Sequence, residues 1–193
     1  MAMPVSALPD RTMWTVADLE ALPPQDGVRY EILYGELLVT PMPSTGHQGV
    51  AHRLTLAFGN WARTQTGWTV LGPGGVHMSE TTWLEPDLAV YAVPAGRSIE
   101  DWRAMPPPAL VIEILSPSTT KTDRHRKRPA YLAHGVVEVW LVDNEMQTFE
   151  RWTAHSEFPQ LHRESIAWAP TDAVAALAID VAELFTKLVT PQR

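Results

Sequence analysis

The sequence predicts a mixed α/β fold in which helices flank a sheet and a β-hairpin lies near the N-terminal end. Residues 29–40 contain two strand-like segments on either side of Tyr34-Gly35, a turn signal typical of a hairpin. Further along, two apolar strand-like runs, 109–116 and 137–143, are separated by one helix-like segment. This order favours two strands that run parallel or are connected across the face of the sheet.

Helical patterns occupy three other parts of the chain. Thr15 is able to cap a short helix over residues 15–22. Apolar residues recur at helical spacing from His47 to Thr64 and predict one amphipathic helix. The tail at 179–185 resembles a short packing helix.

The other strand candidates are short and alternate with turns. The connection after residue 93 is rich in proline and predicts a surface loop with a short helix near residues 98–103. The remaining strand candidates are 68–71, 75–78, the acidic segment 84–91, 148–152 and 164–169.

Length and composition limit the possible domain organisation and the possible cellular location. The 193 residues fit one domain, over residues 13–193, preceded by a flexible N-terminal arm at 1–12. No apolar run approaches the roughly 20 residues that a membrane span needs, and the first residues lack the features of a signal peptide. The absence of cysteine excludes disulfides, thiolate zinc sites and cysteine nucleophiles. These observations predict a cytoplasmic protein without membrane contact.

The charge distribution limits the class of partner. A net charge of -7 argues against a surface that is positive all over. Five of the 15 basic residues nevertheless lie between residues 121 and 128, and they include Arg124, Arg126 and Arg128. This cluster predicts contact with one local anionic partner. The alternative is a solvated helix face.

Two carboxylates in strand-like surroundings form the candidate site. Asp87 lies in the acidic segment, and Glu113 lies in the apolar run that follows it. A carboxylate among aliphatic residues loses hydration energy unless a cation or hydrogen-bond donors compensate for the loss. If the two strands are neighbours, the carboxylates converge in an oxygen-rich pocket of the kind that Mg²⁺ prefers. The alternative is that Asp87 ends a turn after Pro86 and that Glu113 pairs with an arginine.

The segment after the apolar run places three polar residues at intervals of four. On an α-helix this spacing puts Asp123, Lys127 and Tyr131 on one stripe, which can face the carboxylate pocket. An Asp–Lys pair at this spacing is also an ordinary surface ion pair. Pro129 is unfavourable in a helix interior, so the alternative is a helix that begins near Arg128 and leaves Lys127 in the entering loop.

Three further polar residues each allow two interpretations. Glu31 lies in the first hairpin strand, where the pattern alone favours an exposed carboxylate. His47 and Gln48 fall on the first turn of the long predicted helix, where side chains can face a pocket. A histidine at a helix start can equally be structural or exposed to solvent.

Several of these motifs follow one another in an order that resembles a known protein family. They are 29–36, His47-Gln48, Pro86-Asp87, 111–119, Asp123 with Lys127 and Tyr131, and 135–143. In order and spacing they resemble the Uma-two family of restriction-endonuclease-like proteins, a mainly bacterial family within the PD-(D/E)XK nuclease superfamily. The similarity covers roughly residues 14–152 and continues weakly to Phe185.

The resemblance implies a restriction-endonuclease-like fold and a metal-dependent site. Asp87 and Glu113 would hold Mg²⁺ or Mn²⁺, and Glu31 would be a third, auxiliary ligand. The superfamily's lysine normally follows the second acid by two residues, but Leu115 occupies that position here. Lys127 fits a lysine that has migrated to the next helix, where it would activate water or stabilise the phosphate. The resemblance also implies that His47 and Gln48 orient the substrate.

The favoured interpretation is therefore a Mg²⁺-dependent endonuclease that hydrolyses phosphodiester bonds in DNA. Arg124, Arg126 and Arg128 would carry the nucleic-acid contacts. Because double-strand cleavage in this superfamily commonly needs two active sites, we expect a homodimer. The alternative is a catalytically inactive nuclease-fold module that binds DNA or protein, favoured by Leu115, Pro129 and the acidic net charge. A glycosidase with two carboxylates and no metal is disfavoured by the accompanying lysine and basic cluster.

Overall fold

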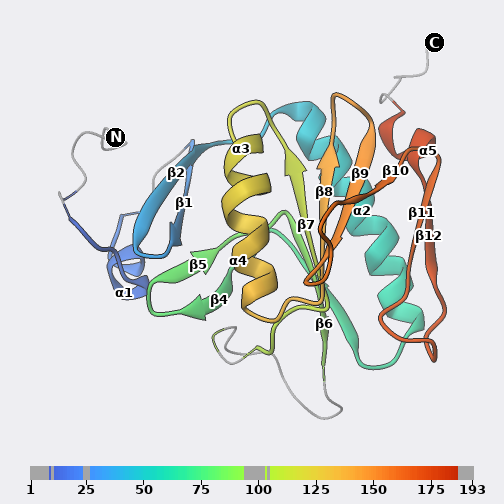
Figure 1. Cartoon of the computed structure of the whole chain (residues 1–193), viewed down its shortest axis with the longest axis horizontal. Helices are drawn as coiled ribbons and strands as arrows, with labels where there is room; N and C mark the ends of the chain where they lie inside the picture. Colours follow the sequence, from blue (N-terminus) through green and yellow to red (C-terminus); the bar gives the residue numbers. More distant parts are fainter. Residues whose placement is uncertain (1–8, 10, 24–26, 94–102, 104, 187–193) are drawn as a thin grey trace.

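The computed structural model describes residues 9, 11–23, 27–93, 103 and 105–186. Within them, a six-stranded sheet with strand order β10-β9-β8-β7-β6-β3 forms the centre of the fold (Figure 1). Strands β7 and β8 are parallel, as predicted, and the other neighbouring pairs of this sheet are antiparallel. The strands are β3 (Trp68–Leu71), β6 (Leu88–Ala92), β7 (Leu110–Leu115), β8 (Glu138–Asp143), β9 (Thr148–Thr153) and β10 (Gln160–His162).

The predicted N-terminal hairpin is confirmed and belongs to a second sheet, with strand order β2-β1-β5-β4. Tyr34 and Gly35 connect β1 to β2 with φ angles of 54° and 82°. Positive φ at both turn residues matches the right-handed twist of the flanking strands, and glycine adopts it at no steric cost. The strands are β1 (Val28–Leu33), β2 (Glu36–Pro41), β4 (Val76–Ser79) and β5 (Thr82–Leu84).

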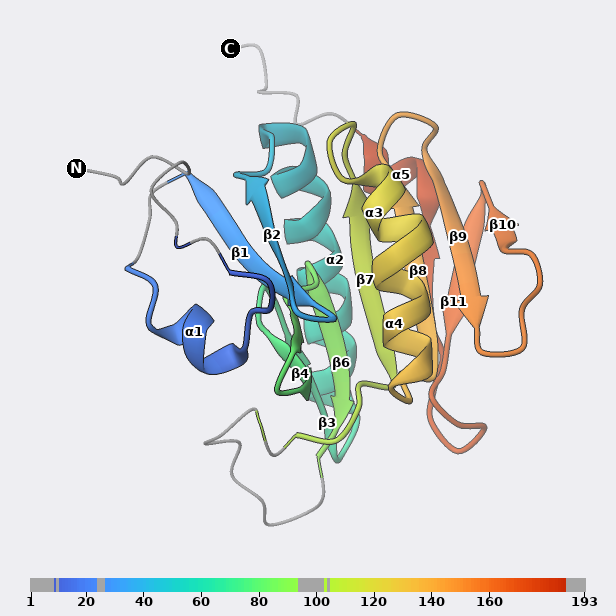
Figure 2. The ribbon, with the colours of Figure 1, turned by 60° about the vertical axis from the view of Figure 1, so that its left-hand side comes forward.

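The two faces of the six-stranded sheet are covered by different helices. The long helix α2 (Thr45–Thr64) packs on one face, and α4 (Arg128–Ala133) packs on the other (Figure 2). Because side chains alternate along a strand, Ile112 and Ile114 of β7 join the α2 core, whereas Val111 and Leu115 join the α4 core. The α2 core also includes residues from β11 (Ser165–Trp168), β12 (Leu177–Asp180) and α5 (Val181–Phe185).

The two predicted N-terminal helices are confirmed, and each has a side-chain cap. Thr15 caps α1 (Val16–Glu20) by accepting a hydrogen bond from the N–H of Asp18, and the Asp18 carboxylate accepts one in return from the N–H of Thr15. Helix α2 begins two residues earlier than predicted, because Ser44 Oγ accepts a hydrogen bond from the N–H of His47. This cap fixes His47 in the first turn.

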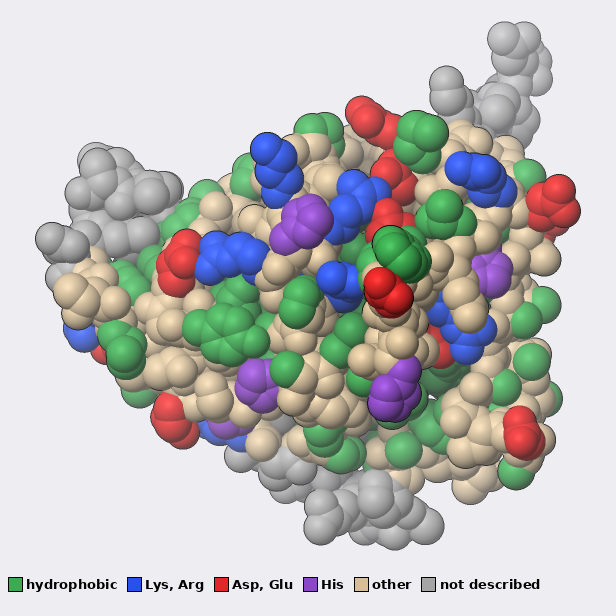
Figure 3. Space-filling model, viewed as in Figure 1, with side chains coloured by type: hydrophobic (Ala, Val, Ile, Leu, Met, Phe, Trp, Pro, Cys, Tyr) green, Lys and Arg blue, Asp and Glu red, His purple; other side chains and the backbone are tan. Residues whose placement is uncertain are grey.

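The helix after β7 runs through a wide turn that accommodates Pro129. It consists of α3 (Thr120–Thr122), the π-helix η3 (Asp123–Lys127) and α4, without a break. The N–H of Arg128 donates to the carbonyl of Asp123, and the Arg128 side chain donates from Nε to the carbonyl of Arg124 at 3.0 Å. Lys127 is therefore helical, and the alternative that placed it in a loop is wrong. Basic and histidine side chains lie over the outward side of this helix, and acidic side chains of neighbouring elements lie among them (Figure 3).

The acidic strand predicted at 84–91 is instead two strands of different sheets. Strand β5 belongs to the four-stranded sheet and β6 to the six-stranded sheet, and residues 85–87 connect them. Pro86 has no N–H for a strand ladder, so a break at this point is physically favoured. Asp87 thus lies at the junction of the two sheets, directly before β6.

The C-terminal part also differs from the sequence-based expectation. Residues 177–180 form strand β12, and the predicted helix begins only at Val181, where Asp180 caps it. Strand β10 has no counterpart among the predicted strands. Most of the predicted arm at 1–12, and the predicted helix at 98–103 except Arg103, lie outside the described residues. No helix in the described part of the chain has the length and apolar character needed to cross a membrane.

Candidate active site

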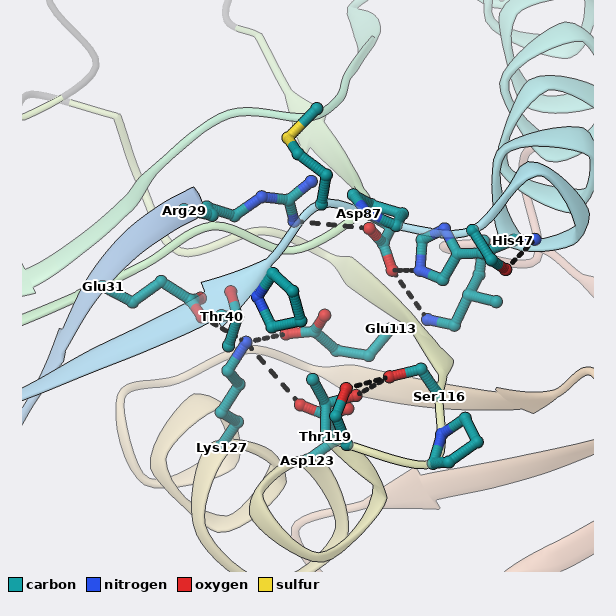
Figure 4. Close-up of a pocket in the computed structure, with 17 residues that line it drawn as sticks. Arg29, Glu31, Thr40, His47, Asp87, Glu113, Ser116, Thr119, Asp123 and Lys127 are labelled. Carbon is teal, nitrogen blue, oxygen red and sulfur yellow. Dashed lines mark hydrogen bonds and ion pairs between the residues drawn. The ribbon is translucent and has the colours of Figure 1, made fainter. Parts of the chain in front are cut away.

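A cavity of about 210 Å³ lies where strands of both larger sheets meet the first turn of α2 and the helix η3 (Figure 4). Its charged lining consists of four carboxylates and two cations, which leaves an excess of two negative charges when all six are ionised. These residues are Arg29, Glu31, Asp87, Glu113, Asp123 and Lys127. The cavity therefore collects all four acids and the lysine that the sequence singled out.

Asp87 and Glu113 lie beside each other at one end of the six-stranded sheet, although Asp87 lies in the connection directly before β6 and not in a strand as predicted. Strands β6 and β7 are antiparallel, with Leu88 opposite Ile112, so Asp87 precedes β6 beside Glu113. The Asp87 carboxylate is held by its surroundings, because Oδ2 accepts a hydrogen bond from the N–H of Ile114 at 2.9 Å. The pairing of β6 with β7 and the hydrogen bond from Ile114 thus place Asp87 next to Glu113.

Asp87 is also held by side chains on opposite sides of its carboxylate (Figure 4). Nε2 of His47 lies 3.0 Å from Oδ2, and Nη1 of Arg29 lies 3.5 Å from Oδ1. Burial alone would raise the pKa of Asp87, but His47, the Ile114 N–H and Arg29 outweigh burial and lower it. Asp87 is consequently an ionised carboxylate, with Oδ1 more loosely held than Oδ2.

The surroundings of Glu113 shift its pKa in the opposite direction from that of Asp87. Its side chain is buried on the α4 side of β7, where Tyr131 donates a hydrogen bond to Oε1 at 2.8 Å. Burial raises the pKa of Glu113 well above its ordinary value; Lys127 opposes this effect, whereas the carboxylates of Asp123, Asp87 and Glu31 add to it. A divalent cation would relieve this crowding of negative charge.

Lys127 is the cation around which three carboxylates gather. Its Nζ lies 2.7 Å from Glu31 Oε2, 3.5 Å from Glu113 Oε1 and 3.6 Å from Asp123 Oδ1. Burial would lower the pKa of Lys127, but the three carboxylates outweigh it and raise the pKa above its ordinary value. The helix stripe predicted from Asp123, Lys127 and Tyr131 therefore faces the carboxylate pocket.

Glu31 is fully buried, so the interpretation as an exposed strand carboxylate is wrong. Its Oε1 accepts a hydrogen bond from the N–H of Glu85 at 2.8 Å, while Oε2 pairs with Lys127. The same carboxylate thus fixes the connection that carries Asp87 and balances the charge of the lysine. Sequence pattern missed this burial because β1 is covered by elements distant in the sequence.

The two residues of the first turn of α2 have different positions. His47 is buried and lines the cavity, and its Nδ1 has no hydrogen-bond partner among the described residues. Gln48 is exposed and is not among the cavity-lining residues. The structure thus places one of the two predicted substrate-orienting residues at the cavity and the other outside it.

The three predicted DNA-contacting arginines lie outside the cavity, and each already has a partner within the chain. Nη2 of Arg124 lies 3.1 Å from Asp143 and 2.6 Å from Glu150. Arg126 donates two hydrogen bonds to Glu36. The guanidinium of Arg128 stacks 3.6 Å above the ring of Trp152. Nucleic acid would have to displace or share these contacts.

Arg29 is a cavity-lining cation that the site prediction missed. It lies two residues before Glu31 on β1, and alternation along a strand puts both side chains on one face. That spacing was the signal that could have found it, once Glu31 was placed in the site. Leu115, at the usual lysine position, is buried in the α4 core and does not line the cavity.

The chemistry of the cavity fits Mg²⁺ or Mn²⁺, although its side chains would have to move to coordinate a metal ion. Its acidic side chains supply the hard oxygen donors that Mg²⁺ prefers, and a dication would balance their excess negative charge. Among the described residues, no group of three or more His, Asp or Glu side chains is already arranged to hold a metal ion. Residues that can hold one are Asp87, through the loosely held Oδ1, and Glu113, with Glu31 beside them.

Comparison with known proteins agrees with the fold and the motifs. A crystal structure of a putative nuclease belonging to DUF820 from Anabaena variabilis ATCC 29413 is similar, with 21% sequence identity and a TM-score of 0.73. The similarity covers 89% of this chain and 97% of that chain, and it confirms the predicted mixed α/β nuclease fold. No curated protein matches the chain. The model of the Uma2 family, described as putative restriction endonuclease, matches residues 16–182, and the chain therefore belongs to this family.

Proposed function

We propose that this protein is a Mg²⁺-dependent endonuclease that hydrolyses phosphodiester bonds in DNA. The observation that supports the proposal most is that Asp87, directly before β6, lies beside Glu113 of β7 in a cavity that Glu31 and Lys127 also line. Carboxylates that share a buried cavity need a common compensating charge. A dication would balance the excess negative charge of the six charged groups, so that the phosphate of a substrate would not meet an uncompensated acidic cavity.

Hydrolysis requires water to form a bond to phosphorus while the bond to the leaving ester oxygen breaks. The water loses a proton to the solvent or a nearby base, and the leaving oxygen gains one. A bound Mg²⁺ would supply positive charge to the phosphate and activate water. Asp87 and Glu113 would hold this cation, and Glu31 would assist them.

Two further side chains have defined tasks in this scheme. Lys127 would stabilise the negative charge that develops on the phosphate, since its ammonium is fixed by Glu31 and by the helix. His47 acts as a positioning residue, because its bond to Oδ2 of Asp87 fixes the orientation of that carboxylate.

The test is cleavage of supercoiled plasmid and of labelled single- and double-stranded DNA with Mg²⁺, Mn²⁺ or EDTA. We expect cleavage that needs the metal and is lost in Asp87→Asn and Glu113→Gln, two substitutions that preserve side-chain shape. Cleavage in EDTA, or equal cleavage by these variants, would refute the proposal. A homodimer is part of the proposal for double-strand cleavage, and light scattering during size-exclusion chromatography tests it.

The second candidate is a nuclease-fold module that binds DNA or protein without turnover. It is favoured by Leu115, which replaces the usual lysine, and by Lys127, whose ammonium is already engaged by three carboxylates. Binding of DNA with Ca²⁺ or Mg²⁺, together with no cleavage of any DNA or RNA, would select this candidate.

A further inference from the structure

The two cations of the cavity differ in how firmly they are held. Lys127 is 5% exposed and has three carboxylates around its ammonium, the nearest at 2.7 Å. Arg29 is 19% exposed, which is the largest exposed fraction among the six charged groups that line the cavity. Arg29 is therefore the more accessible of the two cations to a ligand from solvent.

The contacts of Arg29 are long compared with those of a tight ion pair. Nη1 lies 3.5 Å from Asp87 Oδ1 and 3.3 Å from the carbonyl of Glu85, and Nε lies 3.9 Å from Glu85 Oε2. A well-formed charge-assisted bond between these groups is about 2.7 to 2.9 Å long. The guanidinium is thus oriented by its neighbours but not saturated by them, so it retains the capacity to bind an anion.

The position of Arg29 relative to Asp87 determines which anion it would meet. Oδ2 of Asp87 is occupied by His47 and by the N–H of Ile114, whereas Oδ1 faces the more distant guanidinium. Oδ1 is therefore the oxygen more available to a metal, and Arg29 lies on its side of the carboxylate (Figure 4). A phosphate bound to such a metal would lie within reach of the guanidinium.

We propose that Arg29 binds a non-bridging oxygen of the scissile phosphate, and this inference rests on the proposed nuclease function. The planar guanidinium presents paired N–H donors that match phosphate oxygens, which a lysine ammonium does not. Arg29 would neutralise phosphate charge at the mouth of the cavity, and Lys127 would act from its floor. Arg29 and Lys127 would together supply the positive charge that a lysine at the position of Leu115 would provide.

The experiment compares Arg29→Gln and Arg29→Lys with the wild type in single-turnover cleavage and in Mn²⁺ calorimetry without substrate. We expect cleavage by Arg29→Gln to fall about 10²-fold, as for the loss of one electrostatic catalyst. Mn²⁺ affinity should be kept or increase, because a competing cation has left Asp87. Arg29→Lys should recover little, and added methylguanidinium should partly rescue Arg29→Ala.

The matched control is Arg63→Gln, an exposed arginine in the last turn of α2, roughly 24 Å along the helix axis from His47. It should cleave at the wild-type rate. Wild-type cleavage by Arg29→Gln, or loss of Mn²⁺ binding in that variant, would overturn the phosphate contact while leaving the nuclease function standing.

A wild type that cleaves no DNA would instead reject the proposed function. In that case, the affinity for a single-stranded oligonucleotide, measured with Ca²⁺, tests whether Arg29 binds phosphate. Weaker binding by Arg29→Gln than by Arg63→Gln supports the phosphate contact, and equal binding by the two variants overturns it.

Discussion

The ammonium of Lys127 lies 2.7 Å from Oε2 of Glu31, so a single ion pair joins the helix η3 to the hairpin strand β1. Both partners are buried. The pair is the shortest of three contacts that the ammonium makes with carboxylates, and it closes the floor of the cavity. The stability of the fold and the proposed catalysis therefore both depend on the ammonium of Lys127.

Replacing Lys127 by methionine should destabilise the metal-free protein. The substitution leaves Glu31, Glu113 and Asp123 without their shared cation, and loss of one partner from a buried pair costs about 3 to 5 kcal/mol. Mn²⁺ should restore more stability to Lys127→Met than to the wild type, because it supplies the missing positive charge. Urea unfolding with and without Mn²⁺ measures both effects. Lys121→Met, at an exposed position of the same helix, should change little; an equal change in the two variants contradicts the prediction.

Asp87→Asn should abolish Mn²⁺ binding while preserving the fold. The amide oxygen can still accept the hydrogen bond from the N–H of Ile114, but the charge that would hold a dication is gone. Calorimetry should show no Mn²⁺ binding at concentrations that saturate the wild type, and the circular dichroism spectrum should be unchanged. Retained Mn²⁺ affinity would place the metal away from Asp87.

Most of the fold could be predicted because its elements carry local signals. The apolar spacing of α2 and the Tyr34-Gly35 turn are each encoded within a few neighbouring residues. The pairing of β7 with β8 follows from the handedness and shortness of crossovers. Strand β10 was missed because its three residues are largely exposed and show no apolar alternation. Strand β12 was missed because its last two residues were assigned to the helix predicted at 179–185.

The four carboxylates and the lysine of the cavity could be predicted from the sequence, but Arg29 was missed and the surroundings of these residues could not be predicted. Asp87 and Glu113 stood out because a carboxylate among aliphatic residues needs compensation. The burial of Glu31 depends on Lys127, which lies far away in the sequence, so no local pattern reveals it. The π-helical turn that accommodates Pro129 also could not be predicted from local sequence, because helix propensity by itself favours a break at proline.

Binding of Mn²⁺ should release a proton and strengthen as pH rises. Burial raises the pKa of Glu113 well above its ordinary value, and a metal requires the ionised carboxylate, so the ion must displace the proton. Calorimetry in two buffers of different ionisation enthalpy counts the protons released. Glu113→Gln should release fewer protons, and equal release in variant and wild type would remove Glu113 from the site.

The raised pKa of Glu113 also determines how the stability of the metal-free protein should change with pH. Because the folded pKa of Glu113 is raised, the folded state holds the extra proton, and the stability from this group is present below its unfolded pKa of about 4.3. That contribution should disappear as pH rises toward the folded pKa. Urea unfolding of the wild type and of Glu113→Gln across this pH range measures the difference, and a difference that grows more favourable to the wild type with pH would contradict the assignment.

The arginines on the outer face of the helix should differ in what they contribute to DNA binding. Arg126 and its partner Glu36 are both exposed, and an exposed ion pair is worth only about 0 to 1 kcal/mol, so Arg126 can exchange Glu36 for a phosphate. Arg124 is held by two less exposed carboxylates, Asp143 and Glu150, so Arg124→Gln should mainly reduce stability.

Arg126→Gln should therefore weaken DNA binding and reduce its dependence on salt. Removing one arginine–phosphate interaction lowers the slope of log affinity against log salt by about 0.9 for a duplex. Fluorescence anisotropy with Ca²⁺, over a series of salt concentrations, measures this slope. Glu36→Gln is the matched variant, because it frees the Arg126 guanidinium and should strengthen binding. If both variants keep the wild-type slope, the DNA does not touch this face, and the phosphate interactions must come from the cavity itself.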